Sequence, residues 1–319
     1  MKLVILDSYA LNEGDLDWSG LAALVDEVDA WPRTPYDKAA ERIGDAEFVV
    51  VNKTYIDDAV LDACPKIRWI GLTATGTDSL DIAACRRHGV PVANVPGYST
   101  DSVAQHVFSL LLSICQCPDR YYRAIKGGCW QTDIKPQYGI TPQRELAGKT
   151  IGIVGYGSIG RRVARIAQGF GMKVVCHTRT VRPEYASDGV TFLSLDELLA
   201  VSDIVTLHCP ATDATRGMIG DAALAKMKEG AILINTARGA LADDAAVARA
   251  LHSGHLGFFG TDVVGVEPIR PDNPLLGCDN ALITPHIAWA TAESLARLSA
   301  IVTDNFRSFL DGKPKNIVN

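Results

Sequence analysis

The 319-residue sequence has no long apolar run, no low-complexity tract and no repeat of the solenoid kind. A helix needs about 20 consecutive apolar residues to cross a membrane, so no membrane-spanning segment is expected. Positive charge is not in excess either: 31 Lys and Arg stand against 37 Asp and Glu, a formal net charge of −6 at pH 7. This balance argues against nucleic acid or an anionic membrane as the main partner.

The eight cysteines also lack the spacing of a metal site. Cys115 and Cys117 flank a single residue, whereas paired zinc ligands are usually two to four residues apart. Most of the cysteines lie among apolar residues, as buried thiols do. We therefore expect reduced, structural cysteines and no metal, which indicates a cytoplasmic protein. The N-terminal MKLVILDSYA predicts a strand and is too short for a signal peptide.

Short apolar runs alternate with amphipathic stretches along the chain. The strand-like runs KLVILD, EFVVVNKT, RWIGLTA and VPVANV are interleaved with helical patterns at 37–44, 57–63 and 79–88. A second series comprises TIGIVGYG, MKVVCHT, IVTLHC, AILINTA, GFFGTDVV and ALITPHI, with helices such as 243–254, where Gly254 suits a C-cap. This alternation predicts two domains, each with a parallel sheet covered on both faces.

The order of the segments predicts that one domain is inserted into the other. A helical stretch at 99–128, with a break near Pro118, and a loop at 129–149 lead into the second series. One helix, about 291–311, follows ALITPHI without a further strand, and we infer that it returns to the first domain. The expected domains are therefore 1–100 with 288–319, and 101–287. The cleft between them is the expected site.

The stretch TIGIVGYGSIGRR (150–162) has the glycine pattern of a dinucleotide-binding turn. Gly155 permits the tight turn, Gly157 lets the backbone approach a pyrophosphate, and Gly160 allows close helix–strand packing. A strand precedes the turn and a helix follows it, so the helix N-terminus can hold the anion. The predicted cofactor contacts in the turn are Gly155, Tyr156, Gly157, Ser158, Ile159 and Gly160.

The acidic residue that usually ends the next strand of an NAD enzyme is missing here. Thr178 and Arg179 follow MKVVCH instead. A hydroxyl and a guanidinium suit a 2′-phosphate, because charge-assisted hydrogen bonds hold it. These residues favour NADP, with NAD as the alternative.

Three late strands end in polar residues that form a cation, acid and base set. Arg238 follows ILINTA, Asp262 and Glu267 lie in FFGTDVVGVEP, and His286 ends ALITPH. In open α/β sheets ligands bind beyond the carboxyl ends of the strands. These residues are therefore the candidate active site.

At this point the sequence resembles a known family. GYGSIG, NTARG, GTDVVGVEP and TPHIAWAT, in this order and spacing, are similar to the motifs of the D-isomer-specific 2-hydroxyacid dehydrogenases. TATGTDSLDIAACRRHGVPVANVPGYSTDSVAQH is similar to the family's substrate-domain signature, so the resemblance covers nearly the whole chain. LDSYALNEGDLDW and VNKT look most like the glycerate dehydrogenase/hydroxypyruvate reductase branch, and HTRTVRP resembles NADP-preferring glyoxylate/hydroxypyruvate reductases.

The resemblance implies an α/β fold in which a Rossmann nucleotide domain is inserted into a flavodoxin-like substrate domain, both doubly wound, and a homodimer through the nucleotide domains. It implies that Arg238 holds the substrate carboxylate and carbonyl oxygen, and that His286 exchanges a proton with that oxygen. Glu267 would orient His286 and favour its imidazolium. Backbone N–H groups near Thr75 and Gly76 would bind the carboxylate from the first domain. Lys53 would be a further substrate-binding residue in the cleft, and the alternative is a solvated lysine. The implied cofactor contacts outside the turn are Thr178, Arg179, Cys209, Pro210, Thr236, Ala237, Asp262 and Ala288.

The expected reaction is hydride transfer between NAD(P)H and a small 2-oxo acid to give the D-2-hydroxy acid. Hydroxypyruvate or glyoxylate, giving D-glycerate or glycolate, is the substrate that the branch implies. No metal is required, because Arg238 and His286 supply the electrophilic help. One alternative is a reductase of a phosphorylated or phosphonate-bearing 2-oxo acid, and the other is an NAD(H)-sensing, corepressor-like interaction protein.

Overall fold

The computed structural model describes residues 1–131 and 143–319, which form two compact units. Unit 1 comprises Met1–Ser99 and Ala290–Asn319, and unit 2 comprises Thr100–Trp289. The boundaries expected after residues 100 and 287 lie within two residues of these. Ala288 and Trp289 belong to unit 2 because the Ala288 N–H donates to Asp262 and the Trp289 indole donates to the His286 carbonyl. Residues 132–142 of the expected loop 129–149 lie outside the described residues.

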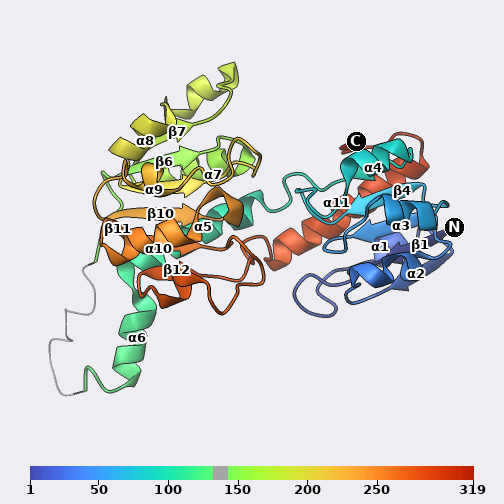
Figure 1. Cartoon of the computed structure of the whole chain (residues 1–319), viewed down its shortest axis with the longest axis horizontal. Helices are drawn as coiled ribbons and strands as arrows, with labels where there is room; N and C mark the ends of the chain where they lie inside the picture. The colour runs from blue at the N-terminus through green and yellow to red at the C-terminus, as the bar shows by residue number, and fades with distance from the viewer. Residues whose placement is uncertain (132–142) are drawn as a thin grey trace. The chain divides into compact units, whose positions relative to one another are not determined.

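Unit 1 is built on a five-stranded parallel sheet (Figure 1). Its strands are β1 (Lys2–Ile5), β2 (Glu27–Ala30), β3 (Phe48–Val51), β4 (Trp69–Leu72) and β5 (Val92–Ala93). The order is β2-β1-β3-β4-β5, the doubly wound order of flavodoxin-like sheets. The edge strand β2 was not predicted, because its sequence EVDA is polar and only half-buried.

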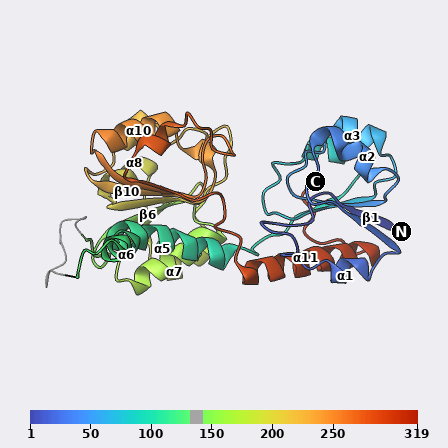
Figure 2. The same cartoon turned by 90° about the horizontal axis from the view of Figure 1, so that it is seen from below.

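Helices cover both faces of this sheet. In Figure 2, α2 and α3 lie on one face, and α1 and α11 lie on the other. Phe306 of α11 packs against Phe48 and Trp69 of the sheet, with ring centroids 4.9 and 5.0 Å apart. This aromatic contact explains why the last helix belongs to unit 1. The helices of the unit are α1 (Ser19–Ala22), η1 (Tyr36–Lys38), α2 (Ala39–Ile43), α3 (Asp58–Ala63), α4 (Ile82–Arg87) and α11 (Ala292–Leu310).

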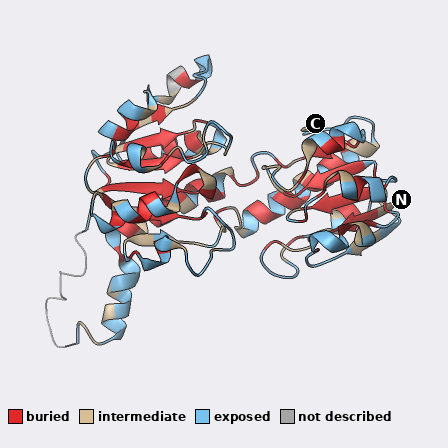
Figure 3. Ribbon diagram, in the orientation of Figure 1, coloured by how far each residue is buried: buried red, intermediate tan, exposed pale blue. Residues whose placement is uncertain are grey.

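Unit 2 contains a seven-stranded parallel sheet whose central strands are buried (Figure 3). The strands are β6 (Thr150–Val154), β7 (Lys173–His177), β8 (Thr191–Phe192), β9 (Ile204–Leu207), β10 (Ala231–Asn235), β11 (Leu256–Thr261) and β12 (Ala281–Ile283). Their order is β12-β11-β10-β9-β6-β7-β8. Counted from β6, the first six strands follow the Rossmann order 3-2-1-4-5-6, and β12 extends the sheet.

The helices of unit 2 sandwich its sheet. α5 and α7 lie on one face and α8 and α10 on the other (Figure 2). The expected break near Pro118 is confirmed: Cys117 has φ +50° between α5 and α6. The C-cap expected at Gly254 lies one residue earlier in the structure: Ser253 caps α10, and Gly254 follows with φ +79°. The helices are α5 (Thr100–Gln116), α6 (Pro118–Lys126), α7 (Ser158–Gly169), η2 (Pro183–Asp188), α8 (Leu195–Val201), α9 (Asp221–Leu224), η3 (Gly239–Leu241), α10 (Asp244–His252) and η4 (Pro274–Gly277).

Two general features bear on function. In each sheet all strands run parallel, so their carboxyl ends meet at one edge, where ligands of open α/β sheets bind. Across residues 1–131 and 143–319, no helix combines the length and apolar composition needed to cross a membrane.

Candidate active site

The three glycines of the turn after β6 have three different surroundings. Gly155 has φ +97°, and a Cβ there would lie 2.5–2.6 Å from backbone atoms of His208 and Cys209. A Cβ at Gly160 would lie 2.2 Å from the Gly155 carbonyl oxygen, so α7 packs closely on β6. A Cβ at Gly157 would meet no atom within 4 Å. These surroundings match a tight turn, close helix–strand packing and an open approach for a ligand.

The residues around this turn fit a dinucleotide. Gly157 is the N-cap of α7 without a side-chain cap, which leaves N–H groups of the first turn for an anion. Thr236, at the end of β10, is buried, and its Oγ1 has no hydrogen-bond partner among the described residues. A buried hydroxyl of this kind needs an acceptor or donor. A cofactor bound at the carboxyl edge of the sheet would supply one.

The Tyr156 side chain points into the protein. Its hydroxyl donates to Asp188 (3.1 Å), and its ring packs edge-on against Tyr185 and Phe192. Burial, with the hydrogen bond to Asp188, raises the pKa of the Tyr156 hydroxyl. The predicted contact between Tyr156 and a cofactor would therefore come from its backbone.

Thr178 and Arg179 lie beside the glycine turn, because the Gly155 N–H donates to the carbonyl of His177 at the end of β7 (2.8 Å). Thr178 is half-buried and Arg179 is exposed. Within the described part of the chain, Arg179 forms no ion pair. Its guanidinium therefore has no carboxylate to neutralise it.

Close approach of two loops places Arg238 near the loop that carries Glu267. A Cβ at Gly239 would lie 1.9 Å from the Val264 carbonyl oxygen, so only glycine fits between the loops after β10 and β11. Arg238 itself is half-buried, and its Nη1 donates to the Ala237 carbonyl (2.9 Å). The glycine in NTARG is thus a requirement of loop packing.

The structure brings His286 and Glu267 together. His286 Nδ1 lies 2.6 Å from Glu267 Oε2, and the two side chains are 30% and 35% exposed. Because a carboxylate only accepts hydrogen bonds, Nδ1 carries a proton and Nε2 is the atom left for exchange with a ligand. The Val264 N–H reaches Glu267 Oε1 (3.4 Å), a weak second contact to the carboxylate.

Asp262 forms hydrogen bonds within the protein. It is 1% exposed, and its oxygens accept from the Thr284 hydroxyl (2.6 Å), the Ile287 N–H (2.9 Å) and the Ala288 N–H (2.8 Å). Asp262 was predicted as a cofactor contact, and its anchoring of the loop 284–288 was not predicted. The predicted contact with the cofactor stays a prediction.

The remaining predicted cofactor residues lie near the same edge of the sheet. Cys209 is half-buried behind β9, and desolvation raises the pKa of its thiol. Pro210 is exposed, and its carbonyl accepts from Thr215 (2.7 Å). The first turn of α7 contributes Ser158, which is exposed, and Ile159, which is half-buried.

The carboxyl edge of the sheet in unit 1 holds the three predicted substrate residues. The buried Asp7 accepts from the N–H groups of Asn52 and Lys53 (both 2.9 Å) and so fixes the turn after β3. Lys53 is exposed and has no partner for its ammonium within the described residues. The N–H groups of Thr75 and Gly76 likewise have no acceptor among the described residues.

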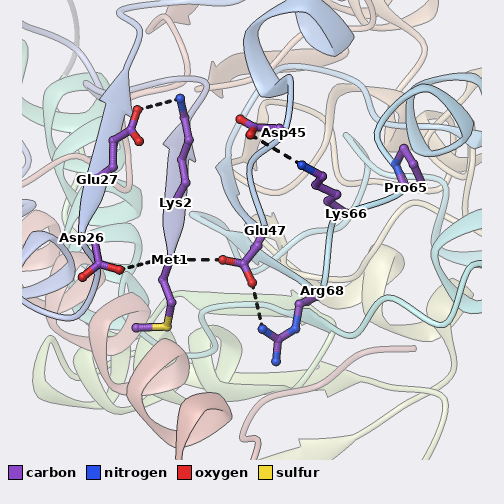
Figure 4. A pocket seen from close by; sticks show the side chains of 9 residues that line it. All are labelled: Met1, Lys2, Asp26, Glu27, Asp45, Glu47, Pro65, Lys66 and Arg68. Carbon is purple, nitrogen blue, oxygen red and sulfur yellow. Dashed lines mark hydrogen bonds and ion pairs between the residues drawn. The ribbon is translucent and has the colours of Figure 1, made fainter.

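A charged depression in unit 1 lies away from these residues. It measures about 560 Å³ and lies at the amino edge of the sheet, around Met1, Lys2 and Arg68 (Figure 4). Its charges pair with one another, as in Lys2–Glu27 (2.8 Å) and Arg68–Glu47 (3.0 Å). None of the predicted site residues lines it.

Comparison with known proteins identifies the family of this chain. Residues 108–288 match the family model described as "D-isomer specific 2-hydroxyacid dehydrogenase, NAD binding domain". A hydroxypyruvate reductase of Blautia hydrogenotrophica is 43% identical, with 100% of both chains covered. The chain therefore belongs to the D-isomer specific 2-hydroxyacid dehydrogenase family, and it is an oxidoreductase with an NAD-binding domain.

Two solved structures share the fold over the whole chain. An acyclic imino acid reductase (Bsp5) in complex with NADPH and D-Arg has a TM-score of 0.89 and 28% identity, with 100% of both chains covered. D-lactate dehydrogenase from Aquifex aeolicus, complexed with NAD and lactic acid, has a TM-score of 0.85 and 30% identity, covering 100% of this chain and 99% of that one. The two neighbours hold different cofactors, so they leave the choice between NAD and NADP open.

Proposed function

We propose that this protein reduces hydroxypyruvate or glyoxylate to D-glycerate or glycolate. The observation that carries the proposal is the 2.6 Å contact between His286 Nδ1 and Glu267 Oε2. The 43% identity to a protein named hydroxypyruvate reductase supports this substrate. NAD(P)H, when bound, supplies the hydride that reaches carbon 2 of the 2-oxo acid.

His286 provides the proton in this reaction. Glu267 fixes the ring and stabilises the imidazolium, so Nε2–H points outward as a general acid. As carbon 2 gains a hydride, the carbonyl oxygen becomes an alcohol oxygen by taking the Nε2 proton. In the reverse direction neutral Nε2 accepts the proton back.

Arg238 and unit 1 bind the substrate in this proposal. The forked guanidinium of Arg238 holds the carboxylate and the carbonyl oxygen, where negative charge grows in the transition state. The open N–H groups of Thr75 and Gly76 bind the carboxylate, and Lys53 adds a positive charge. A larger anionic substrate, with a phosphate or phosphonate, is the variant of this proposal that Lys53 would favour.

We further propose that NADP(H) is preferred, that the protein is cytoplasmic and that it forms a homodimer. Arg179 is exposed and forms no ion pair with any described residue, which supports a 2′-phosphate contact. The eight free cysteines support a reducing compartment. Exposed apolar side chains on and after α6 support a dimer: Tyr122 is 59%, Ile125 41% and Trp130 58% exposed.

The proposal is tested by hydroxypyruvate turnover of the wild type and of His286→Ala. Loss of the general acid should lower kcat about a hundredfold or more, while NADPH still binds, as followed by its fluorescence. His88→Ala, in unit 1, is the control histidine and should keep wild-type turnover. Equal turnover of His286→Ala and wild type would remove His286 as the proton donor.

A further inference from the structure

A chain of three polar side chains lies behind the turn that carries His286. His106 of α5 places Nε2 3.0 Å from the Thr284 hydroxyl, and this hydroxyl lies 2.6 Å from Asp262 Oδ1. His106 Nε2 is itself 3.6 Å from Asp262 Oδ1. The side chains of His106 and Asp262 are only 18% and 1% exposed. No role in the reaction described above uses His106 or Thr284.

The direction of the hydrogen bonds in this chain follows from its chemistry. Asp262 can only accept, so the single hydroxyl proton of Thr284 goes to Asp262 at 2.6 Å rather than to the Thr261 carbonyl at 3.4 Å. Thr284 Oγ1 must then accept from His106, which puts a proton on His106 Nε2. Burial lowers the pKa of His106, against the opposing effect of the Asp262 charge, so the ring is neutral with one fixed tautomer.

Asp262, the last of these three side chains, determines the backbone conformation at His286. His286 has φ +55°, a left-handed conformation that is unfavourable for a residue with a Cβ. Hydrogen bonds hold it there: the His286 N–H donates to the Asp262 carbonyl (2.8 Å), and the next two N–H groups donate to the Asp262 carboxylate (2.9 and 2.8 Å). The position of the imidazole therefore depends on a buried, charged Asp262.

Helix α5 is a rigid support for the first member of the chain. A Cβ at Gly260 of β11 would lie 3.1 Å from Ile114 Cδ1 and 3.3 Å from Leu110 Cβ, so α5 packs directly on the strand that leads to Asp262. Leu110 is one helical turn after His106. The packing distance between α5 and β11 thus sets the distance from His106 to Thr284.

We propose that His106 is a positioning residue for the reaction, acting through Thr284 and Asp262 on the backbone of His286. The inference rests on the proposed function, in which His286 exchanges the proton. His106 donates to the Thr284 hydroxyl, and this hydroxyl donates to the Asp262 carboxylate, which water hardly reaches. In such chains each hydrogen bond strengthens the next. Without these two side chains Asp262 keeps its charge with fewer donors, and the turn 284–288 loses its single conformation.

The first test compares His106→Leu with His106→Gln in hydroxypyruvate reduction. Leu removes the donor, and kcat should fall roughly tenfold to a hundredfold, as a small misplacement of a catalytic group does. Gln can present an amide N–H near the place of Nε2, so it should recover most of the activity. The KM for the cofactor should stay within about twofold of wild type in both variants, because neither changes the phosphate turn.

The matched control is His255→Leu. His255 is also a part-buried histidine of unit 2 with one hydrogen bond, from the ring to the Leu224 carbonyl (2.9 Å), but it precedes β11 at the opposite edge of the sheet. Its loss should lower Tm without lowering kcat. Equal falls of kcat in His255→Leu and His106→Leu would overturn the positioning role, because general destabilisation would then explain both.

A readout independent of turnover is the proton NMR signal of the His286 ring in the enzyme alone. Wild type and His106→Gln should give one sharp signal, and His106→Leu should give a broadened or split one. Thr284→Val should behave like His106→Leu, and the double variant should be no worse than either, because both break the same chain. If His286→Ala is inactive while His106→Leu keeps wild-type kcat and signal, the positioning role is wrong and the proton-transfer role stands. An active His286→Ala overturns both.

Discussion

His286 is held by two independent sets of groups, one at its ring and one at its backbone. Glu267 fixes Nδ1, and Asp262 fixes the turn through the carbonyl and both carboxylate oxygens. The ring contact sets which nitrogen is available, and the backbone contacts set where it points. Both are needed because a general acid works only within hydrogen-bond reach of the atom it protonates.

The proton role of His286 predicts opposite pH profiles in the two directions. Reduction needs the Nε2 proton of the imidazolium, so its rate should fall as pH rises through the range in which the ring loses that proton. Oxidation of the D-2-hydroxy acid needs neutral Nε2, so its rate should rise over the same range. Steady-state rates in both directions, with chemistry shown to be rate-limiting, check this. Profiles of the same shape would exclude a shared proton carrier.

Arg238 should contribute to both binding and turnover. In the proposed function, its contacts to the carboxylate would be made in the ground state, and its contact to the carbonyl oxygen would strengthen in the transition state. Arg238→Ala should therefore raise the KM for hydroxypyruvate and lower kcat. Arg238→Lys keeps the charge but loses the forked guanidinium, so its kcat and KM should lie between those of wild type and Arg238→Ala. An Ala variant with unchanged kcat would limit Arg238 to substrate binding.

We expect Thr178 and Arg179 to set the preference between NADPH and NADH. A charged hydrogen bond to a 2′-phosphate contributes about 1.5–3 kcal/mol, which corresponds to roughly ten- to hundredfold in kcat/KM. Wild type should therefore prefer NADPH over NADH. Arg179→Ala should abolish the preference mainly through the NADPH KM, and Thr178→Asp should reverse it by like-charge repulsion. A wild-type preference for NADH would show that Arg179 makes no such contact.

At the scale of elements, η2 is tied to α7 beside the phosphate turn. Arg161 Nε and Nη2 lie 3.0 and 3.3 Å from the Asp188 oxygens, and the Tyr156 hydroxyl reaches the same carboxylate. The hydrogen bond from Arg161 lowers the pKa of Asp188. A carboxylate with a lowered pKa in the folded state stabilises the fold above its unfolded pKa of about 3.9 and loses this effect as pH falls through the folded value.

The prediction at this scale concerns Asp188→Asn. The variant should melt below the wild type at pH 7, and the difference in Tm should shrink as pH falls through the lowered pKa of Asp188 and the wild-type carboxyl becomes protonated as well. Thermal melts at several pH values measure this. Asp196→Asn, which removes an exposed pair with Lys226, is the control and should change Tm little. A difference that persists unchanged to low pH would show that the Asp188 charge is not its source.

The elements also show what could be predicted from sequence. Long buried strands such as β6 and β10 were evident from their apolar runs, and the roles of Gly155 and Gly160 followed from the motif. The strands β2 and β8 were missed, because two to four half-exposed residues give no hydrophobic period. His106 was missed because its partner Thr284 lies 178 residues away, and sequence spacing carries no information on that contact.

At the scale of the whole molecule, the exposed apolar residues around α6 predict self-association. Ile125→Asp and Trp130→Asp should shift the protein to the monomer in sedimentation experiments, because each places a charge in an apolar contact. Val201→Asp is the control: this residue is 41% exposed at the end of α8 and should leave the mass unchanged. A mass that is the same for wild type and the α6 variants would place any dimer contact elsewhere.

Reduction of a small 2-oxo acid by this protein is tested most directly by turnover of the purified wild type. NADPH or NADH oxidation should be followed with hydroxypyruvate, glyoxylate, a phosphorylated 2-oxo acid and no substrate, with chiral analysis of the product. The account predicts saturable turnover of hydroxypyruvate or glyoxylate, faster with NADPH, and D-glycerate from hydroxypyruvate. Cofactor binding without turnover of any 2-oxo acid would contradict it and would favour a nucleotide-sensing interaction protein.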